Sequence, residues 1–160
     1  MPIKLREAIK TDMDSVLALI KELAAFENEP DAVDISVDIL IKDGFGDNSS
    51  FKVFVAELES RIVGMALFYP RYSTWKGKSL HLEDLIVQQN YRGRGIGNKL
   101  YTMVLKYAND NNYKRVAWEV LDWNKVAIDF YKSTGAKVFD EWRIAQIDKK
   151  SMKSYIEKID

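Results

Sequence analysis

The feature of the sequence that most restricts its fold is a glycine-rich hexapeptide, Arg92-Gly93-Arg94-Gly95-Ile96-Gly97. It follows an apolar run over residues 79–88 that is typical of a strand, and apolar residues then recur at helical spacing over residues 100–108. Glycines let the backbone approach a ligand closely, and the start of a helix offers unpaired N–H groups that suit a phosphate. The two arginines add charge and hydrogen-bond donors. Taken alone, the hexapeptide is equally consistent with a tight loop that carries exposed arginines.

The patterns on both sides of the hexapeptide predict an α+β (mixed α/β) fold around one central sheet. Strands form a meander in the first half of the chain and then alternate with helices. Thr11 and Asp14 resemble a capping box at the start of the first helix, and Gly44 and Gly135 mark the ends of two later helices. The predicted strands are residues 3–6, 51–59, 61–72, 79–88 and 115–121, with 137–139 and 142–147 as a closing pair. The predicted helices are residues 11–24, 37–44 and 124–134, a long helix through residues 100–108, and a short charged helix at the end.

Composition excludes several classes of protein. The 24 basic residues balance the 24 acidic residues, so no global field attracts nucleic acid or an anionic membrane. There is no cysteine and only one histidine, His81, which excludes disulfides, a cysteine nucleophile and a multi-histidine metal site. The charged first fourteen residues do not fit a signal peptide, and the longest apolar run, residues 62–69, is too short for a membrane span. We expect one cytoplasmic domain, residues 3–160, without a metal.

Two other phosphate-binding loops fit the hexapeptide less well. A Walker loop ends in Gly-Lys-Ser/Thr, and this ending is missing. A dinucleotide-binding fingerprint would have the spacing Gly-x-Gly-x-x-Gly after the first strand of a βαβ unit, whereas here the glycines are more compact and come late in the chain. A nucleotide-binding protein is therefore a weak alternative.

The compact pattern Gln/Arg-x-x-Gly-x-Gly/Ala resembles the pyrophosphate-binding loop of the GNAT acetyltransferases. A second block, Asn124-x-x-Ala127-x-x-Phe130-Tyr131-x-x-x-Gly135-Ala136, is similar to a late motif of the same family. The resemblance to this family covers essentially the whole chain. The resemblance implies a mostly antiparallel central sheet flanked by helices, acetyl-CoA as the co-substrate, a small-molecule amine as the acceptor, and a homodimer.

Other segments resemble one subfamily, the spermidine/spermine acetyltransferase group. They are residues 23–27, 43–46, 72–77, 82–84 and 123–124. Ser73-Thr74 and Leu121-Asp122-Trp123-Asn124 are closer to its thialysine N-epsilon-acetyltransferase branch, because the polyamine branch has Asp-Pro at the position of Ser73-Thr74. The resemblance therefore implies a thialysine- or lysine-like acceptor, with a polyamine as the alternative.

The resemblance also implies roles for individual residues. Tyr131 is the implied general acid, although its helical spacing with Ala127 and Phe130 also fits simple core packing. Glu83 is a candidate base, directly or through water, with a solvent-facing strand residue as the alternative. The implied cofactor-binding residues are Leu85, Ile86, Val87, Arg92, Gly93, Arg94, Gly95, Ile96, Gly97, Asn98, Asn124, Ala127 and Thr134. The candidate substrate-binding residues are Phe26, Glu27, Ser73, Thr74, Trp75, Glu83 and Asp84.

Some assignments stay open at this point. Asp84 should face away from Glu83 unless a bulge intervenes, because side chains alternate along a strand. His81 is expected to be structural, since no partner acid is identifiable. The roles of Asp140 and Glu141 are undetermined. A non-catalytic acyl-CoA-binding regulatory module is the alternative from another class of protein.

Overall fold

The computed structural model describes residues 2–159. The chain divides into two compact units, one ending at Glu119 and the other beginning at Val120, and each is described by itself. The strands of the first unit are β1 (Lys4–Glu7), β2 (Lys52–Leu58), β3 (Arg61–Ser73), β4 (Gly77–Val87) and β5 (Val116–Ala117). Its helices are η1 (Lys10–Asp12), α1 (Met13–Phe26), α2 (Val37–Gly44), η2 (Gln89–Tyr91) and α3 (Ile96–Asp110).

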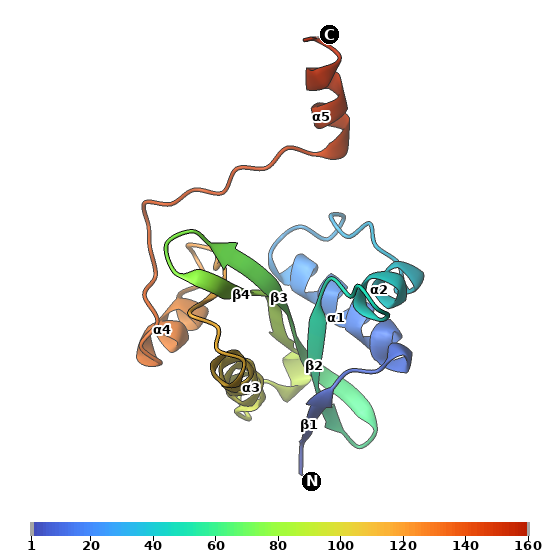
Figure 1. Cartoon of the computed structure of the whole chain (residues 1–160). Helices are drawn as coiled ribbons and strands as arrows, with labels where there is room; N and C mark the ends of the chain where they lie inside the picture. Colours follow the sequence, from blue (N-terminus) through green and yellow to red (C-terminus); the bar gives the residue numbers. More distant parts are fainter. Residues whose placement is uncertain (1, 160) are drawn as a thin grey trace. The chain divides into compact units, whose positions relative to one another are not determined.

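The five strands of the first unit form one sheet in the order of the sequence (Figure 1). Strands β1 to β4 are antiparallel neighbours, and β5 joins β4 in parallel. Two residues with positive φ, Glu59 and Ser60, make the tight turn between β2 and β3, as the sequence predicts. The mixed, mostly antiparallel sheet confirms the expected fold class.

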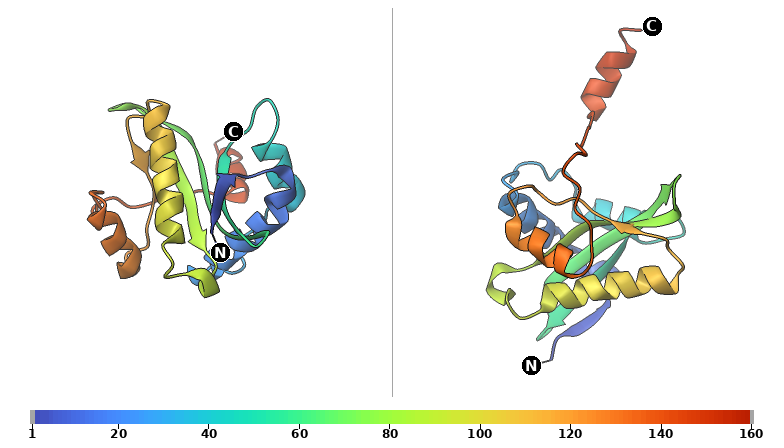
Figure 2. Two further views of the ribbon diagram at one scale, coloured as in Figure 1. Left: turned by 90° about the horizontal axis from the view of Figure 1, so that it is seen from below. Right: turned by 90° about the vertical axis from the view of Figure 1, so that its left-hand side faces the viewer.

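Helices cover both faces of this sheet (Figures 1 and 2). On one face, α1 and α2 pack the apolar stripe of each helix against apolar side chains of β2, β3 and β4. On the other face lies α3, whose Tyr107 ring is 5.2 Å from the Phe68 ring and 5.9 Å from the Phe54 ring. The strands between the two layers are therefore apolar on both sides, which explains the continuous apolar run over residues 62–69.

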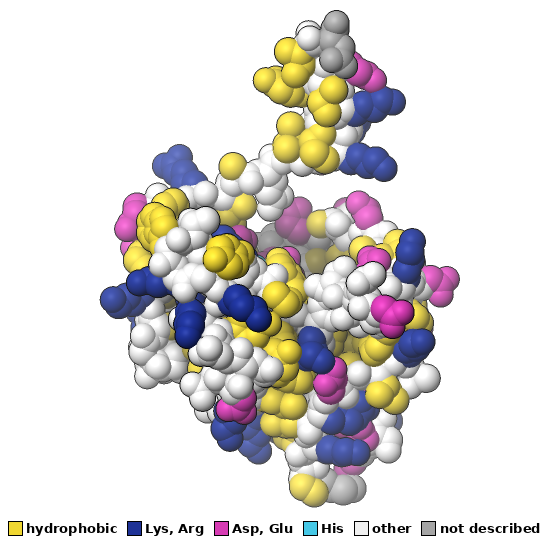
Figure 3. Space-filling model, viewed as in Figure 1, with side chains coloured by type: hydrophobic (Ala, Val, Ile, Leu, Met, Phe, Trp, Pro, Cys, Tyr) yellow, Lys and Arg dark blue, Asp and Glu magenta, His cyan; other side chains and the backbone are white. Residues whose placement is uncertain are grey.

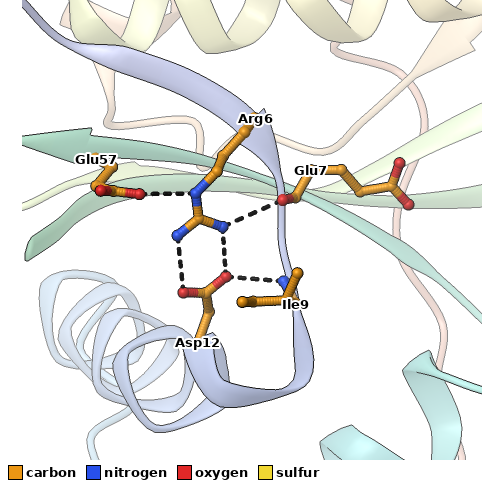
Figure 4. A network of polar contacts seen from close by, with 5 residues as sticks. All are labelled: Arg6, Glu7, Ile9, Asp12 and Glu57. Atoms are coloured by element: carbon orange, nitrogen blue, oxygen red, sulfur yellow. Dashed lines mark hydrogen bonds and ion pairs between the residues drawn. The ribbon is translucent and has the colours of Figure 1, made fainter. Parts of the chain in front are cut away.

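The start of the first unit is fastened by a polar network around Arg6 (Figure 4). The guanidinium donates to both carboxylate oxygens of Asp12, at 2.7 and 3.0 Å, and to Glu57 at 2.7 Å. The hydrogen bond from Arg6 is the main cause that holds the pKa of Asp12 below its usual range. Asp12 also accepts from the backbone N–H of Ile9 at 2.8 Å, so the residue that organises this helix start is Asp12. The capping box predicted at Thr11 and Asp14 is wrong.

The second unit contains two helices, α4 (Lys125–Ser133) and α5 (Lys149–Ile156). The Asn124 side chain caps α4 by accepting from the backbone N–H of Ala127, and Gly135, with φ of 93°, follows its end as predicted. The predicted closing strands, 137–139 and 142–147, are wrong, since no strand is formed within residues 120–159. The strand predicted over 115–121 shrinks to β5. Alternating apolar residues favour a strand, but a strand forms only where a partner edge is present.

No helix within residues 2–159 is long and apolar enough to cross a membrane. Basic and acidic side chains are interspersed on the face that Figure 3 shows. This distribution matches the balanced charge of the sequence.

Candidate active site

A β-bulge in β4 determines where the acidic side chains of the candidate site point. Leu67 of β3 pairs with Asp84, whereas the next residue, Phe68, pairs with Leu82, so Glu83 is the extra residue. Side chains that alternate along a regular strand would place Glu83 and Asp84 on opposite faces. With the bulge, Asp84 shares the face of Leu67, toward α1, and Glu83 reaches the same side. The sequence analysis expected Asp84 to face away from Glu83 unless a bulge intervened, and this bulge is present.

Three carboxylates influence one another at this bulge. Glu27 follows the last residue of α1, and its pKa is raised by burial and by the charge of Glu83. Asp84 is half-buried, and burial, followed by the charges of Glu83 and Glu27, raises its pKa to about 7. The structure thus brings together three predicted substrate-binding residues, Glu27, Glu83 and Asp84. Such a cluster attracts a cation and can hold a proton near neutral pH.

Glu83 accepts two polar contacts on the same carboxylate oxygen. The Tyr69 hydroxyl donates to Oε2 at 2.8 Å, and His81 Nε2 lies 3.3 Å from the same oxygen. Burial and the hydrogen bond to Glu83 raise the pKa of Tyr69 to about 12, so its hydroxyl stays a donor at neutral pH. The side chain of Glu83 is 50% exposed, which leaves the carboxylate accessible to a substrate.

The expectation that His81 lacks a partner acid is wrong. His81 is buried, and residues two apart on a strand share a face, so Glu83 is its natural neighbour. The spacing His81-x-Glu83 is a signal that sequence reasoning overlooked. Tyr69 and Arg71 were also missed, because their positions opposite β4 follow only from the strand register.

One edge of β4 is open beside the candidate site. Strand β5 pairs with β4 only at Leu80 and His81. From Leu82 to Val87, this edge has no strand partner among residues 2–159, whereas Leu85, Ile86 and Val87 pair with β3 on the other side. The backbone N–H and C=O groups of an open edge can bind an extended ligand.

The glycine-rich loop begins where β4 ends. The Arg92 side chain makes contacts within the protein. Its Nε donates to the carbonyl of Val87 at 2.8 Å, and its guanidinium carbon lies 5.3 Å from the centre of the Phe26 ring. Arg92 also lies 3.9 Å from Glu22 of α1. This residue therefore fastens the loop to β4 and α1. Arg94 is exposed, with its guanidinium 5.5 Å from the Tyr91 ring centre.

The loop leads directly into α3. Gly93 and Gly95 have φ of 75° and 74°, a conformation that L-residues with a side chain rarely adopt. Gly95 is the N-cap of α3 and provides no side-chain oxygen, so the N–H groups of Ile96, Gly97 and Asn98 at the first turn are without a side-chain cap. The helix dipole and these N–H groups make the turn suited to a phosphate.

The structure separates another group of predicted substrate-binding residues from Glu83. Ser73 of β3 is opposite Gly77 of β4. Gly77 precedes Glu83 by six residues, and six residues of extended strand span roughly 20 Å. Its hydroxyl oxygen accepts from the backbone N–H groups of Trp75 at 3.3 Å and Lys76 at 3.1 Å. Ser73 therefore stabilises the β3–β4 turn, on which Thr74 and Trp75 are exposed.

In the second unit, the predicted residues lie on or beside α4. Tyr131 is buried, and its ring centre is 5.4 Å from that of Phe130. Asn124 and Ala127 form the capped start of the helix, and Thr134 ends it by donating its hydroxyl to the Tyr131 carbonyl at 2.7 Å. Asp140 and Glu141 are exposed. Among residues 2–159 no cluster of side chains is arranged to hold a metal ion.

Comparisons with known proteins show what this chain is similar to. The Acetyltransferase (GNAT) family matches residues 16–136. A thialysine N-epsilon-acetyltransferase of Bos taurus is 39% identical over 94% of this chain and 95% of its own length. A spermidine/spermine N(1)-acetyltransferase-like protein of Homo sapiens is 38% identical over 83% of this chain but only 20% of its own length. The structure of an integron cassette protein from the mobile metagenome of V. cholerae has a similar fold, with a TM-score of 0.78, 24% identity, and coverage of 98% of this chain and 99% of that one.

The raised pKa of Asp84 predicts a pH-dependent gain in stability for Asp84→Asn. An acid whose folded pKa, about 7, lies above the ordinary 3.8 contributes stability below pH 3.8 and loses it as the pH rises through 7. The neutral amide avoids this loss. We expect the melting temperature of Asp84→Asn to exceed that of the wild type by several degrees at about pH 8.5, and by little near pH 4, where Asp84 is largely protonated in the folded chain and about half protonated in the unfolded chain.

Calorimetry at both pH values checks this expectation, with Asp14→Asn as the control because Asp14 is exposed at the start of α1. Equal melting temperatures of Asp84→Asn and the wild type at the higher pH would contradict it.

Proposed function

This chain belongs to the GNAT family of acetyltransferases and is an acetyl-transfer enzyme, and we propose that it moves the acetyl group of acetyl-CoA to the primary amine of a thialysine- or lysine-like amino acid. The arrangement along β4 carries the proposal. Carboxylates suited to an ammonium stand at the bulge, and a helix start suited to a phosphate follows the end of the same strand. An open strand edge lies between them.

We assign the cofactor-binding residues to three segments. The first-turn N–H groups after Gly95 face the pyrophosphate of acetyl-CoA in this proposal, with Arg94 as a nearby cation. The open edge at Leu85, Ile86 and Val87 provides backbone groups for the pantetheine arm and for the thioester carbonyl, on which negative charge develops. Asn124, Ala127 and Thr134 form the third segment, and we assign them to the cofactor because they match family positions at the late motif.

The amine must lose a proton before it can attack the thioester. A lysine-like ammonium has a pKa near 10.4, so only about one molecule in two thousand is the free base at pH 7. This handicap corresponds to roughly 4–5 kcal/mol. Glu83 takes the proton, directly or through water, while Glu27 and Asp84 attract the cationic substrate. Tyr131 returns a proton to the departing thiolate, a role that rests on the family motif.

The choice of a thialysine- or lysine-like acceptor over a polyamine rests on two observations. The chain is 39% identical to a thialysine enzyme over nearly its whole length. In addition, the guanidinium of Arg71 lies 3.4 Å from His81, close to the acidic cluster, where it repels the second cation of a polyamine and attracts the carboxylate of an amino acid. A diamine or polyamine remains the alternative acceptor, and an acyl-CoA-binding regulatory module is the alternative without catalysis.

We further propose that residues 3–160 act as one acetyltransferase domain in the cytoplasm. The family match over residues 16–136 spans parts of both compact units, which supports a single functional domain. The absence of cysteine from the sequence fits a reducing compartment.

A substitution in the glycine-rich loop tests acetyl-CoA binding. We expect Gly95→Val to raise the Kd for acetyl-CoA at least about tenfold, because a branched side chain disfavours φ of 74° and displaces the first turn from the phosphates. Apart from the two neighbouring residues in the chain, no residue has an atom within 4 Å of the added Cβ, so a clash with the rest of the protein is not the cause. Isothermal titration calorimetry measures the change.

Gly46→Val is the matched control, since Gly46 also has positive φ, at 121°, and open space around its Cβ. It should lose comparable stability and keep its affinity for acetyl-CoA. An unchanged Kd in folded Gly95→Val would exclude this loop from the site.

Substrate choice is tested with a panel of amines and acetyl-CoA. The purified chain is assayed with thialysine, lysine, spermidine, a short diamine and a peptide. We expect kcat/KM for thialysine or lysine to exceed that for spermidine at least about tenfold, since a charge of the wrong sign near the site costs on the order of 1–2 kcal/mol. A higher value for spermidine would favour the polyamine alternative. Tyr131→Phe is the catalytic control: binding without turnover in both proteins would support the regulatory module.

We propose that the chain forms a homodimer. The second unit supports this, because Trp142, Ile144, Ile147 and Tyr155 are 56–71% exposed, and large exposed apolar side chains often mark protein contacts. Apolar side chains also gather on α5 in Figure 3. Light scattering during size-exclusion chromatography should give twice the mass of one chain, 18.5 kDa. Ending the chain before residue 142 should give the mass of a single chain, and a wild type that is already monomeric would contradict the proposal.

A further inference from the structure

His81 stands between a fixed cation and the proposed base. Its Nδ1 lies 3.4 Å from Arg71 Nη1, and its Nε2 lies 3.3 Å from Glu83 Oε2. The His81 side chain is buried, with only 9% of it exposed, and its ring centre is 5.2 Å from that of Tyr69. Strand pairing places Tyr69 directly opposite His81, so the ring is confined by the sheet.

The two neighbours of His81, Arg71 and Glu83, determine which ring nitrogen carries the hydrogen. An arginine guanidinium can donate hydrogen bonds and cannot accept them, so His81 Nδ1 must be the acceptor of the contact with Arg71. In a neutral imidazole the other nitrogen then carries the hydrogen. Nε2–H consequently points at the Glu83 carboxylate, which accepts.

We propose that His81 is a positioning residue for Glu83, with its tautomer fixed by Arg71 on one side of the ring and by the Glu83 carboxylate on the other. Together with the Tyr69 hydroxyl, at 2.8 Å, the His81 N–H holds Oε2 of Glu83 in place. The other oxygen, Oε1, is thereby oriented to take the proton of the amine. This inference rests on the role proposed for Glu83, which His81 serves without contacting the substrate.

The charges around Glu83 make such a support necessary. The charge of Glu83 acts on Glu27, which follows α1, and on Asp84 of the same strand, and Glu119 is close enough to act on Tyr69. Repulsion among these carboxylates would turn an exposed Glu83 side chain toward solvent. Two donors on one oxygen oppose that rotation, while Arg71 provides the compensating positive charge behind the ring.

The tautomer can be observed without any activity measurement, because His81 is the only histidine in the chain. In the protein labelled with ¹⁵N-histidine, we expect the ring shifts of the neutral imidazole to show a hydrogen on Nε2 and none on Nδ1. Removing both neighbours, in Arg71→Met/Glu83→Leu, should populate the other tautomer, whereas Arg61→Met, at the exposed start of the same strand as Arg71, should change nothing. A wild-type ring that carries its hydrogen on Nδ1 would overturn the inference.

Kinetics test whether His81 acts through Glu83. His81→Phe keeps the ring and loses both nitrogens, and we expect kcat for the amine to fall about tenfold while the Kd for acetyl-CoA stays within about twofold. His81→Gln restores a donor and should recover most of the loss. The acid limb of the pH profile should move to higher pH in His81→Phe, because a carboxylate that has lost a donor takes up a proton more readily.

The double variant Glu83→Gln/His81→Phe separates this inference from the proposed function. It should be no slower than Glu83→Gln alone, since a residue that acts through Glu83 adds nothing once the base is gone. Additive losses, or normal kinetics in His81→Phe beside an impaired Glu83→Gln, would overturn the inference alone. A Glu83→Gln variant with normal kinetics would remove the proposed base and the inference with it.

Discussion

The bulge at Glu83 is the constraint on which the candidate site depends. Before it, Tyr69 is opposite His81, and after it, Leu67 is opposite Asp84, so one extra residue changes which face the rest of β4 presents. Without it, Glu83 and Asp84 would lie on opposite faces, and the acidic side chains would be divided between the α1 layer and the α3 layer. A bulge interrupts hydrogen bonding locally, and the long β3–β4 ladder on both sides of it keeps the register.

A comparison of two carboxylates of the first unit, Asp12 and Asp84, shows that, within the described part of the chain, the acidic cluster of the candidate site has no fixed cation paired with it. Asp12 is buried next to Arg6, and the guanidinium keeps the pKa of that carboxyl low. Asp84 is half-buried among other acids, and its pKa is raised to about 7. Among residues 2–159, no cationic side chain makes an ion pair with Asp84 or Glu27. The fixed guanidinium of Arg6 balances the charge of Asp12, whereas a mobile cation, such as an ammonium substrate, is needed to balance the charge at Asp84.

The sequence allowed the elements of the first unit to be predicted closely, because helical periodicity and turn residues are local signals. It also allowed the glycine-rich loop and the acidic residues of β4 to be recognised. Pairing between strands is not local, so the roles of Tyr69 and Arg71 near Glu83 could not be predicted, and β5 is shorter than its apolar pattern suggested. The predicted closing strands failed for the same reason: alternation at residues 142–147 shows that a strand is possible but does not provide its partner.

The balance of charges over the whole chain conceals a separation of charge along β4. Carboxylates gather at the bulge, the next residues up to Val87 are mostly apolar, and the positive end of the α3 dipole follows after the loop. Four residues, 84–87, separate Glu83 from the end of the strand, which corresponds to about 13 Å of extended chain. A ligand with a phosphate at one end and a reactive group on a flexible arm can lie along the open edge and bring that group to the acids. Strand length and the position of the bulge thus set the distance between the anion-binding and cation-binding ends, and a shift of the bulge by two residues would change this distance by roughly 7 Å without altering the fold.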